Sequence, residues 1–271
     1  MISTLIRMEL KKLVVQKEFY IILGICTLMI WLSQKAFFLS EVQPYRFSKT
    51  LLDFIPMIGY LLLLFPIIVV VARILPFEYE QKMVELLATY KYGRKRLLLV
   101  KLMVLFCACA FTVFYFFLIA GIISYLFYGL DDWTLNIKSI DWTYMNMYLE
   151  GEWRVWQVLI FQYIYLLLST FTFALSLFLV ARFVRRSVFI MLIGGAGVLV
   201  VELLDKFVMG FVNQMKISEY INIMITYSSN SLINFEFLNL FTFPQLFIGL
   251  VIYILLLIII NILVEGKTVN D

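Results

Sequence analysis

The sequence predicts an all-α integral membrane protein, and three observations lead to that prediction. Hydrophobic residues make up 63% of the 271 positions, well above the apolar share of roughly 45–50% in soluble domains. The mean hydropathy is +0.97. The apolar residues form runs of about 20 residues, the length at which a helix crosses a hydrocarbon core of about 30 Å. Strands of a membrane barrel would be shorter and would alternate in polarity, so the spans are expected to be helices.

Six transmembrane helices are predicted, within a single domain over residues 1–271. Their expected ranges are 19–39, 54–75, 97–128, 155–181, 187–205 and 244–264. An even number of spans puts both termini on one side of the membrane. Of the 22 Lys and Arg residues, 15 fall on the side of the termini and seven on the other. The positive-inside rule therefore predicts cytoplasmic termini, and a multi-pass protein of a bacterial plasma membrane is expected. The net charge of +4 follows from this topology, so no nucleic-acid partner is expected.

Residues 1–18 are compatible with a helix ahead of the first span. An apolar side and a basic side are expected, formed respectively by Ile2, Leu5, Ile6 and Leu13 and by Arg7 and Lys11. Glu9 falls near the apolar side. We expect an N-terminal interfacial helix on the cytoplasmic surface. The alternative is a solvated positive flank that only orients the first span.

Three connections are expected on the outer side. The first, at about 40–53, is short. The second, at about 129–154, is acidic and rich in tryptophan, which suits an interfacial belt; its tryptophans are Trp133, Trp142 and Trp153. The third, an insertion at 206–243 before the sixth span, is too apolar for a free loop. We expect this insertion to be re-entrant or interfacial, folded against the outer ends of the spans.

The segment at 77–96 concentrates charge between two apolar runs. A helical period of 100° per residue predicts an amphipathic helix over 78–90. One face carries Tyr79, Met83, Leu86, Leu87 and Tyr90, and the opposite face carries Glu78, Lys82, Glu85 and Thr89. A polar hairpin that merely orients the neighbouring spans would have a similar composition. Periodicity alone therefore leaves both interpretations open.

This charged segment resembles the region after the second span in ABC exporter permeases of the second type, which are six-span subunits that work with a separate ATPase. That region typically reads E-x-E-x-G-T, a leucine pair, P-x-S-R and a later K. The matching places here are Glu78, Glu80, Leu86, Leu87, Arg94 and Lys101. The departures are Lys82 and Met83 for Gly-Thr, Lys91 for Pro and Gly93 for Ser. The motif covers residues 78–101, while the predicted topology extends the resemblance over most of the chain.

The resemblance implies that residues 77–96 form a cytoplasmic coupling segment whose helix docks on the ATPase. The implied coupling residues are Glu78, Glu80, Met83, Glu85, Leu86, Leu87, Tyr90 and Arg94. It also implies a second permease chain, identical or related, and export of an amphipathic or lipid-soluble substrate such as an antimicrobial peptide or antibiotic. Membrane lipids are the other expected partners.

The chain has no phosphate-loop motif of the form G-x-x-x-x-G-K-[ST]. ATP and magnesium would therefore bind in the partner, and neither enzymatic activity nor a cofactor is expected in this chain. Histidine is absent, which excludes histidine-based catalysis and histidine metal sites, so no metal site is expected. The cysteines Cys26, Cys107 and Cys109 fall inside predicted spans, with no spacing for a disulfide framework or zinc.

Glu202 and Asp205 share a face near the outer end of the fifth predicted span. Ionisable groups inside spans are costly, so one interpretation is an intramembrane polar site for a substrate or ion. The other is an i,i+4 pair of Glu202 with Lys206 near the interface. In the same span, Gly194, Gly195 and Gly197 allow close packing of helices.

Two other classes of function stay open. An ion-gradient-driven secondary transporter would favour inverted repeats and paired carboxylates at mid-membrane, and neither is clear in the sequence. A membrane immunity or assembly protein without transport has no need of an amphipathic cytoplasmic helix.

Overall fold

The computed structural model describes residues 2–14, 16–39, 47–54, 59–76, 93–129, 133–136, 153–184, 186–212 and 243–267. Within these ranges the regular elements are helices, and the only pairing of extended backbone is one isolated antiparallel bridge between Asn136 and Arg154. The predicted all-α class is therefore confirmed for the described residues.

Four described helices are long and apolar enough to cross a membrane. They are α2 (Lys17–Leu39), α7 (Gly93–Tyr128), α8 (Val155–Ala181) and α11 (Phe243–Lys267). These helices coincide with four of the predicted spans, and α8 has the predicted bounds. The chain is thus an α-helical membrane protein by the length and composition of its helices.

The other two predicted spans correspond to α4 and α9. α4 (Tyr60–Ile74) has 15 residues, which at 1.5 Å per residue extend about 22 Å and fall short of a hydrocarbon core. α9 (Ser187–Val212) has 26 residues, and the part whose side chains are described, Ser187–Leu199, is apolar. Membrane crossing at 54–75 and 187–205 stays a prediction.

The start predicted for the second span is wrong. Phe54 is the last residue of α3 (Phe47–Phe54), a helix that lies in the expected outer connection, and α4 begins only at Tyr60. The first residues of the insertion predicted at 206–243 belong to α9, which continues to Val212. Residues 213–242 lie outside the described part of the chain.

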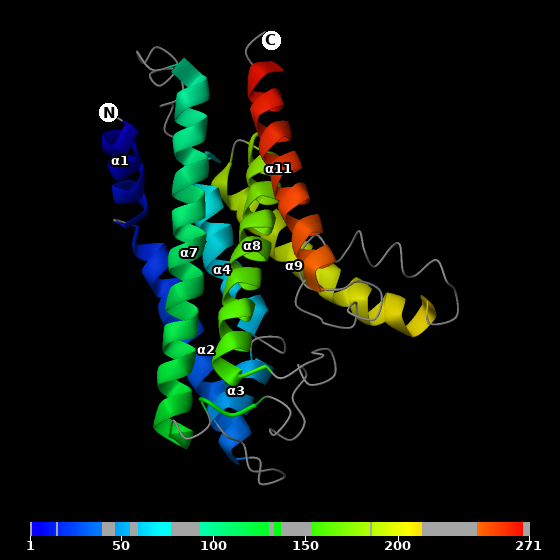
Figure 1. Cartoon of the computed structure of the whole chain (residues 1–271). Helices are drawn as coiled ribbons and strands as arrows, with labels where there is room; N and C mark the ends of the chain where they lie inside the picture. Colours follow the sequence, from blue (N-terminus) through cyan, green and yellow to red (C-terminus); the bar gives the residue numbers. More distant parts are fainter. Residues whose placement is uncertain are drawn as a thin grey trace.

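The helices form an elongated bundle with α8 at its centre (Figure 1). α8 contacts α4, α7, α9 and α11, and α4 contacts α1, α2, α7 and α9 as well. α1 (Ile2–Val14) and the C-terminal end of α11 lie at one end of the bundle, which we call the terminal end. α3 and the start of α8 lie at the opposite end, which we call the α3 end (Figure 1).

Two clusters of buried apolar side chains hold the bundle together. One joins α1, α2, α4, α7, α8, α9 and α11 around residues such as Ile67, Leu105 and Phe178. The other joins α2, α3, α4, α7 and α8 around Ile30 and Leu52. Because lipid tails are as apolar as these side chains, close packing and interhelical hydrogen bonds stabilise the contacts between membrane helices.

Polar side chains connect helices inside the bundle. Gln34 of α2 donates from Nε2 to the Ala120 carbonyl of α7 at 3.2 Å, and Cys26 Sγ contacts the Leu62 carbonyl at 3.2 Å. Asn261 of α11 donates to the Leu175 carbonyl of α8 at 3.5 Å. Cys26, Cys107 and Cys109 are free thiols. These contacts tie α2 and α11 to the central helices.

The helix predicted at the N-terminus is present as α1. Leu5, Ile6 and Leu10 pack against the core and Leu13 is buried, as the predicted apolar side requires. Glu9 is only 7% exposed, and its Oε1 atom accepts a hydrogen bond from Lys12 Nζ at 2.6 Å. The ion pair explains how a carboxylate is accommodated beside the apolar side. The position of α1 on the cytoplasmic surface stays a prediction.

Candidate functional site

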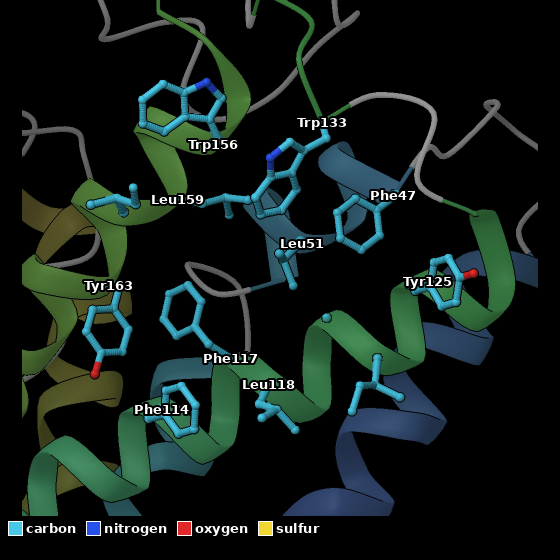
Figure 2. Close-up of a pocket in the computed structure, with 13 residues that line it drawn as sticks. Phe47, Leu51, Phe114, Phe117, Leu118, Tyr125, Trp133, Trp156, Leu159 and Tyr163 are labelled. Carbon is cyan, nitrogen blue, oxygen red and sulfur yellow. The ribbon is translucent and has the colours of Figure 1, made fainter.

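An apolar groove opens between α7 and α8 near the α3 end of the bundle (Figure 2). Its volume is about 620 Å³. We call it the aromatic groove, and it is lined by Phe47, Leu51, Phe114, Phe117, Leu118, Gly121, Ile122, Tyr125, Trp133, Trp156, Leu159, Ile160 and Tyr163. The groove combines residues from two long membrane helices, one short helix and one connection.

The two long walls of the groove follow from helical spacing. On α7 the lining residues recur at intervals of three and four positions from Phe114 to Tyr125, and on α8 they do so from Trp156 to Tyr163. Residues at these intervals share one face of a helix. Phe117 and Tyr163 meet across the two helices, with ring centroids 5.5 Å apart in an edge-to-face arrangement. This contact closes the groove between its walls.

α3 and Trp133 close the groove at the α3 end (Figure 2). Phe47 and Leu51 are buried and lie one turn apart on α3. The Phe47 ring centroid is 6.1 Å from that of Trp133, which stays 42% exposed. The aromatic groove is therefore a tertiary feature, because its end wall comes from segments that are not continuous with its side walls.

Hydrogen bonds keep these segments in place. The Gln162 side chain of α8 donates from Nε2 to the Leu52 carbonyl of α3 at 3.3 Å. The Val155 amide at the start of α8 donates to the Leu135 carbonyl at 3.1 Å, next to the Asn136–Arg154 bridge. These bonds attach α3 and the Trp133 segment to α8. The same helix supplies one wall of the groove.

The chemistry of the lining suits an apolar ligand. The rim is exposed, with Phe114, Leu118, Ile122, Tyr125 and Ile160 open to the surroundings. The floor includes the buried Leu51 and Leu159. None of the lining residues carries a charge, and the polar atoms are the hydroxyls and indole nitrogens of tyrosine and tryptophan. Such a site can bind an acyl chain or the apolar face of an amphipathic molecule.

Most of the site residues predicted from the sequence lie outside the described residues. This holds for Glu78, Glu80, Met83, Glu85, Leu86, Leu87 and Tyr90, all within 77–92. Arg94 belongs to the first turn of α7, so the end of the predicted coupling segment at 93–96 is part of a membrane helix. Glu202 and Asp205 lie on α9, and their side chains are outside the described part.

The sequence contained only a partial signal for the aromatic groove. The sequence predicts Trp133 in an interfacial belt and places residues 47–53 in a connection. Phe47 and Leu51 do have the i,i+4 spacing of a helix face, and the segregation of polar from apolar residues marks 47–54 as amphipathic. Among the described residues, no group of three or more Cys, Asp or Glu side chains is arranged to hold a metal ion.

Comparison with known proteins adds no relative: no protein-family model and no curated protein sequence matches this chain.

Proposed function

We propose that this chain is the transmembrane permease subunit of an ATP-driven ABC exporter, and that it moves an amphipathic or lipid-soluble substrate such as an antimicrobial peptide or antibiotic. The observation that carries the proposal is the order of residues between Glu78 and Lys101, which follows the coupling-helix pattern of ABC exporter permeases of the second type. The proposed partners are a separate ATPase, which holds ATP and magnesium, and a second permease chain.

The helical bundle supports this assignment. Its four long apolar helices fit a membrane subunit. α1 and the C-terminal end of α11 share the terminal end of the bundle (Figure 1), and the charge distribution predicts that this end is cytoplasmic. α4 ends at Ile74 and α7 begins at Gly93, so the proposed coupling segment connects these two helices. The coupling segment would thus follow α4 on the side where a soluble ATPase can reach it.

The aromatic groove supports the proposed substrate class. It lies at the opposite, α3 end, which would be the outer half of the membrane in this topology (Figure 1). An uncharged, aromatic lining favours the apolar part of a substrate, and the tyrosine and tryptophan polar atoms favour a position near the interface. A strongly charged small solute would gain little from this lining.

Charge reversal in the coupling segment tests the proposal. The double variant Glu78→Lys with Glu85→Lys would place two cations on the face that we propose meets basic residues of the ATPase. We expect the chain purified from its native membranes to carry an ATPase with a phosphate-loop sequence, identified by mass spectrometry. The reversal should remove that ATPase and the associated ATP hydrolysis, while leaving the amount of inserted permease unchanged.

A matched control makes the same change of charge on the other side of the membrane. Asp141→Lys with Glu150→Lys alters the expected outer connection, and it should leave ATPase binding intact. If the coupling-segment variant retains the ATPase as well as the control does, the coupling role is wrong. If mass spectrometry detects no ATPase with the purified wild-type chain, the exporter assignment is wrong.

A further inference from the structure

A second pocket lies where α1, α2 and α4 meet, at the terminal end of the bundle. Its volume is about 830 Å³. We call it the basic pocket, and it is lined by Met8, Lys11, Lys12, Gln16, Lys17, Glu18 and Arg73. Lys11 and Lys12 belong to the last turn of α1, with Met8 one turn earlier, and Gln16 lies between α1 and α2. Lys17 and Glu18 belong to the first turn of α2, and Arg73 belongs to the last turn of α4.

The packing of α1 brings these charges together. α1 contacts α4 and α7, and only two residues separate its last residue, Val14, from Lys17, where α2 begins. At this turn the Gln16 amide donates to the Leu13 carbonyl at 3.1 Å. Arg73 then reaches α2 through a hydrogen bond from Nη2 to Glu18 Oε1 at 2.7 Å. Cations that only orient a membrane span need not lie close to one another. Here cations from three helices line the same pocket.

The basic pocket has an excess of positive charge. Four cations and one carboxylate line it, and Glu9 adds a second carboxylate through its ion pair with Lys12. Glu18 is paired with Arg73. Lys11 and Lys17 are exposed and form no ion pair with any residue in the described part of the chain. The two unneutralised ammonium groups favour an anion between the ends of α1 and α2.

Gln16 supplies a second, independent feature of a binding site. Its Oε1 atom is buried and accepts no hydrogen bond from any described residue. A buried acceptor without a donor is costly, so a ligand with a hydroxyl group would be favoured there. Exposed apolar side chains flank the pocket, with Met8 and Val14 on α1 and Ile21 on α2. Cations, a hydroxyl acceptor and apolar flanks therefore occur together where a candidate membrane helix begins.

We propose that the basic pocket binds the headgroup of an anionic phospholipid that carries a glycerol headgroup. Its phosphate would lie between Lys11 and Lys17, its headgroup hydroxyl would donate to Gln16 Oε1, and its acyl chains would lie along the exposed apolar residues of α1 and α2. Basic pockets beside membrane helices are suited to such headgroups. The lipid would hold α1 against the bundle at the membrane surface, and this role does not depend on the proposed exporter function.

The test measures lipid retention by the full-length chain in detergent with native mass spectrometry. Phosphatidylglycerol is compared with phosphatidylcholine of the same acyl chains, and inorganic phosphate is added in a third arm. The wild type should retain phosphatidylglycerol in preference to phosphatidylcholine. Lys11→Gln with Lys17→Gln should weaken this retention by about tenfold or more, since each cation near an anionic lipid contributes about fivefold.

Two controls separate a built site from general attraction. Lys35→Gln with Arg186→Gln removes the same charge from exposed residues that do not line the pocket, and it should change retention by less than about twofold. Lys11→Arg with Lys17→Arg keeps the charge and should keep retention. If the control that removes charge outside the pocket loses as much lipid retention as Lys11→Gln with Lys17→Gln, the proposal is overturned. Equal retention of phosphatidylglycerol and phosphatidylcholine by the wild type would also overturn it. Displacement of the lipid by millimolar inorganic phosphate would instead identify a free-anion site and would also overturn it.

The role of Gln16 has its own test. Phosphatidylethanol has the same phosphodiester charge as phosphatidylglycerol but lacks the headgroup hydroxyls. The wild type should therefore retain phosphatidylglycerol more tightly, and Gln16→Leu should abolish that difference without removing the preference for anionic lipids. A wild type that does not distinguish the two anionic lipids would contradict the assigned position of the glycerol.

Discussion

Gly194 of α9 lies so close to Ile68 of α4 that a Cβ atom added to Gly194 would fall 2.9 Å from both Cγ1 and Cγ2 of Ile68. The same Cβ would lie 3.2 Å from Leu177 Cδ2 of α8. Three helices therefore meet where a side chain is absent, as small residues allow in membrane bundles. Gly195 and Gly197 lie in the same glycine-rich stretch of α9, but nothing lies within 4 Å of a Cβ atom added to either of them.

Gly194→Ala should destabilise the bundle. Ile68 is buried and branched at Cβ, so no single rotation can move both of its γ carbons away. Overpacking of this kind costs about 1–3 kcal/mol. Gly195→Ala is the matched control, because both variants gain the same roughly 1 kcal/mol of helix propensity. We expect a lower midpoint of thermal unfolding in detergent for Gly194→Ala than for Gly195→Ala. Equal midpoints would show that α4 and α9 do not approach this closely.

A hydrogen bond between Thr27 and Tyr115 should stabilise the contact of α2 with α7. Thr27 Oγ1 donates to the Leu23 carbonyl at 2.8 Å, so its oxygen accepts from the Tyr115 hydroxyl, also at 2.8 Å. Tyr115→Phe keeps the ring and its stacking on Phe111, and it should lower the free energy of unfolding by about 0.5–1.5 kcal/mol. Tyr125→Phe is the control, because Tyr125 is exposed.

A double-mutant cycle isolates this bond. Thr27→Val and Tyr115→Phe should be less than additive when combined, with a coupling of about 0.5–1.5 kcal/mol. Strict additivity, measured by chemical unfolding in detergent, would mean that the two hydroxyls do not interact.

Filling the aromatic groove should reduce its capture of apolar molecules. Leu118 lies on the rim, and Leu118→Trp would extend a larger ring into the groove. A long-chain alkyl diazirine serves as the probe, with the labelled residues mapped by mass spectrometry after illumination. We expect labelling at Phe114, Trp156 and Ile160 to fall at least threefold, since the filled volume excludes the chain.

Leu126→Trp provides the comparison for the groove experiment. Leu126 is on the same helix and is exposed, but it does not line the groove. Its substitution should leave the labelling pattern unchanged. Labelling spread evenly over all exposed faces of α7 and α8, with no change in Leu118→Trp, would contradict a binding role for the groove.

The helical class and the approximate bounds of the long apolar helices can be predicted from the amino-acid sequence. The apolar run of α8 is bounded by Arg154 and Arg182, so the change from charged to apolar residues marks both ends locally. The amphipathic helix α1 was predictable for the same reason, since its apolar side repeats at helical intervals. The sequence does not mark the end of α3, because hydropathy stays high from Phe54 to Tyr60.

Tertiary structure decided which surfaces meet. The aromatic groove joins Phe47, Trp133 and residues of α7 and α8, and the basic pocket joins Lys11, Lys17 and Arg73. Likewise, only Gly194 among three neighbouring glycines of α9 lies at a close contact. Periodicity is a local property that says which residues share one helix face. Which face packs against which depends on side chains far apart in the sequence, and these meet only once the helices have assembled.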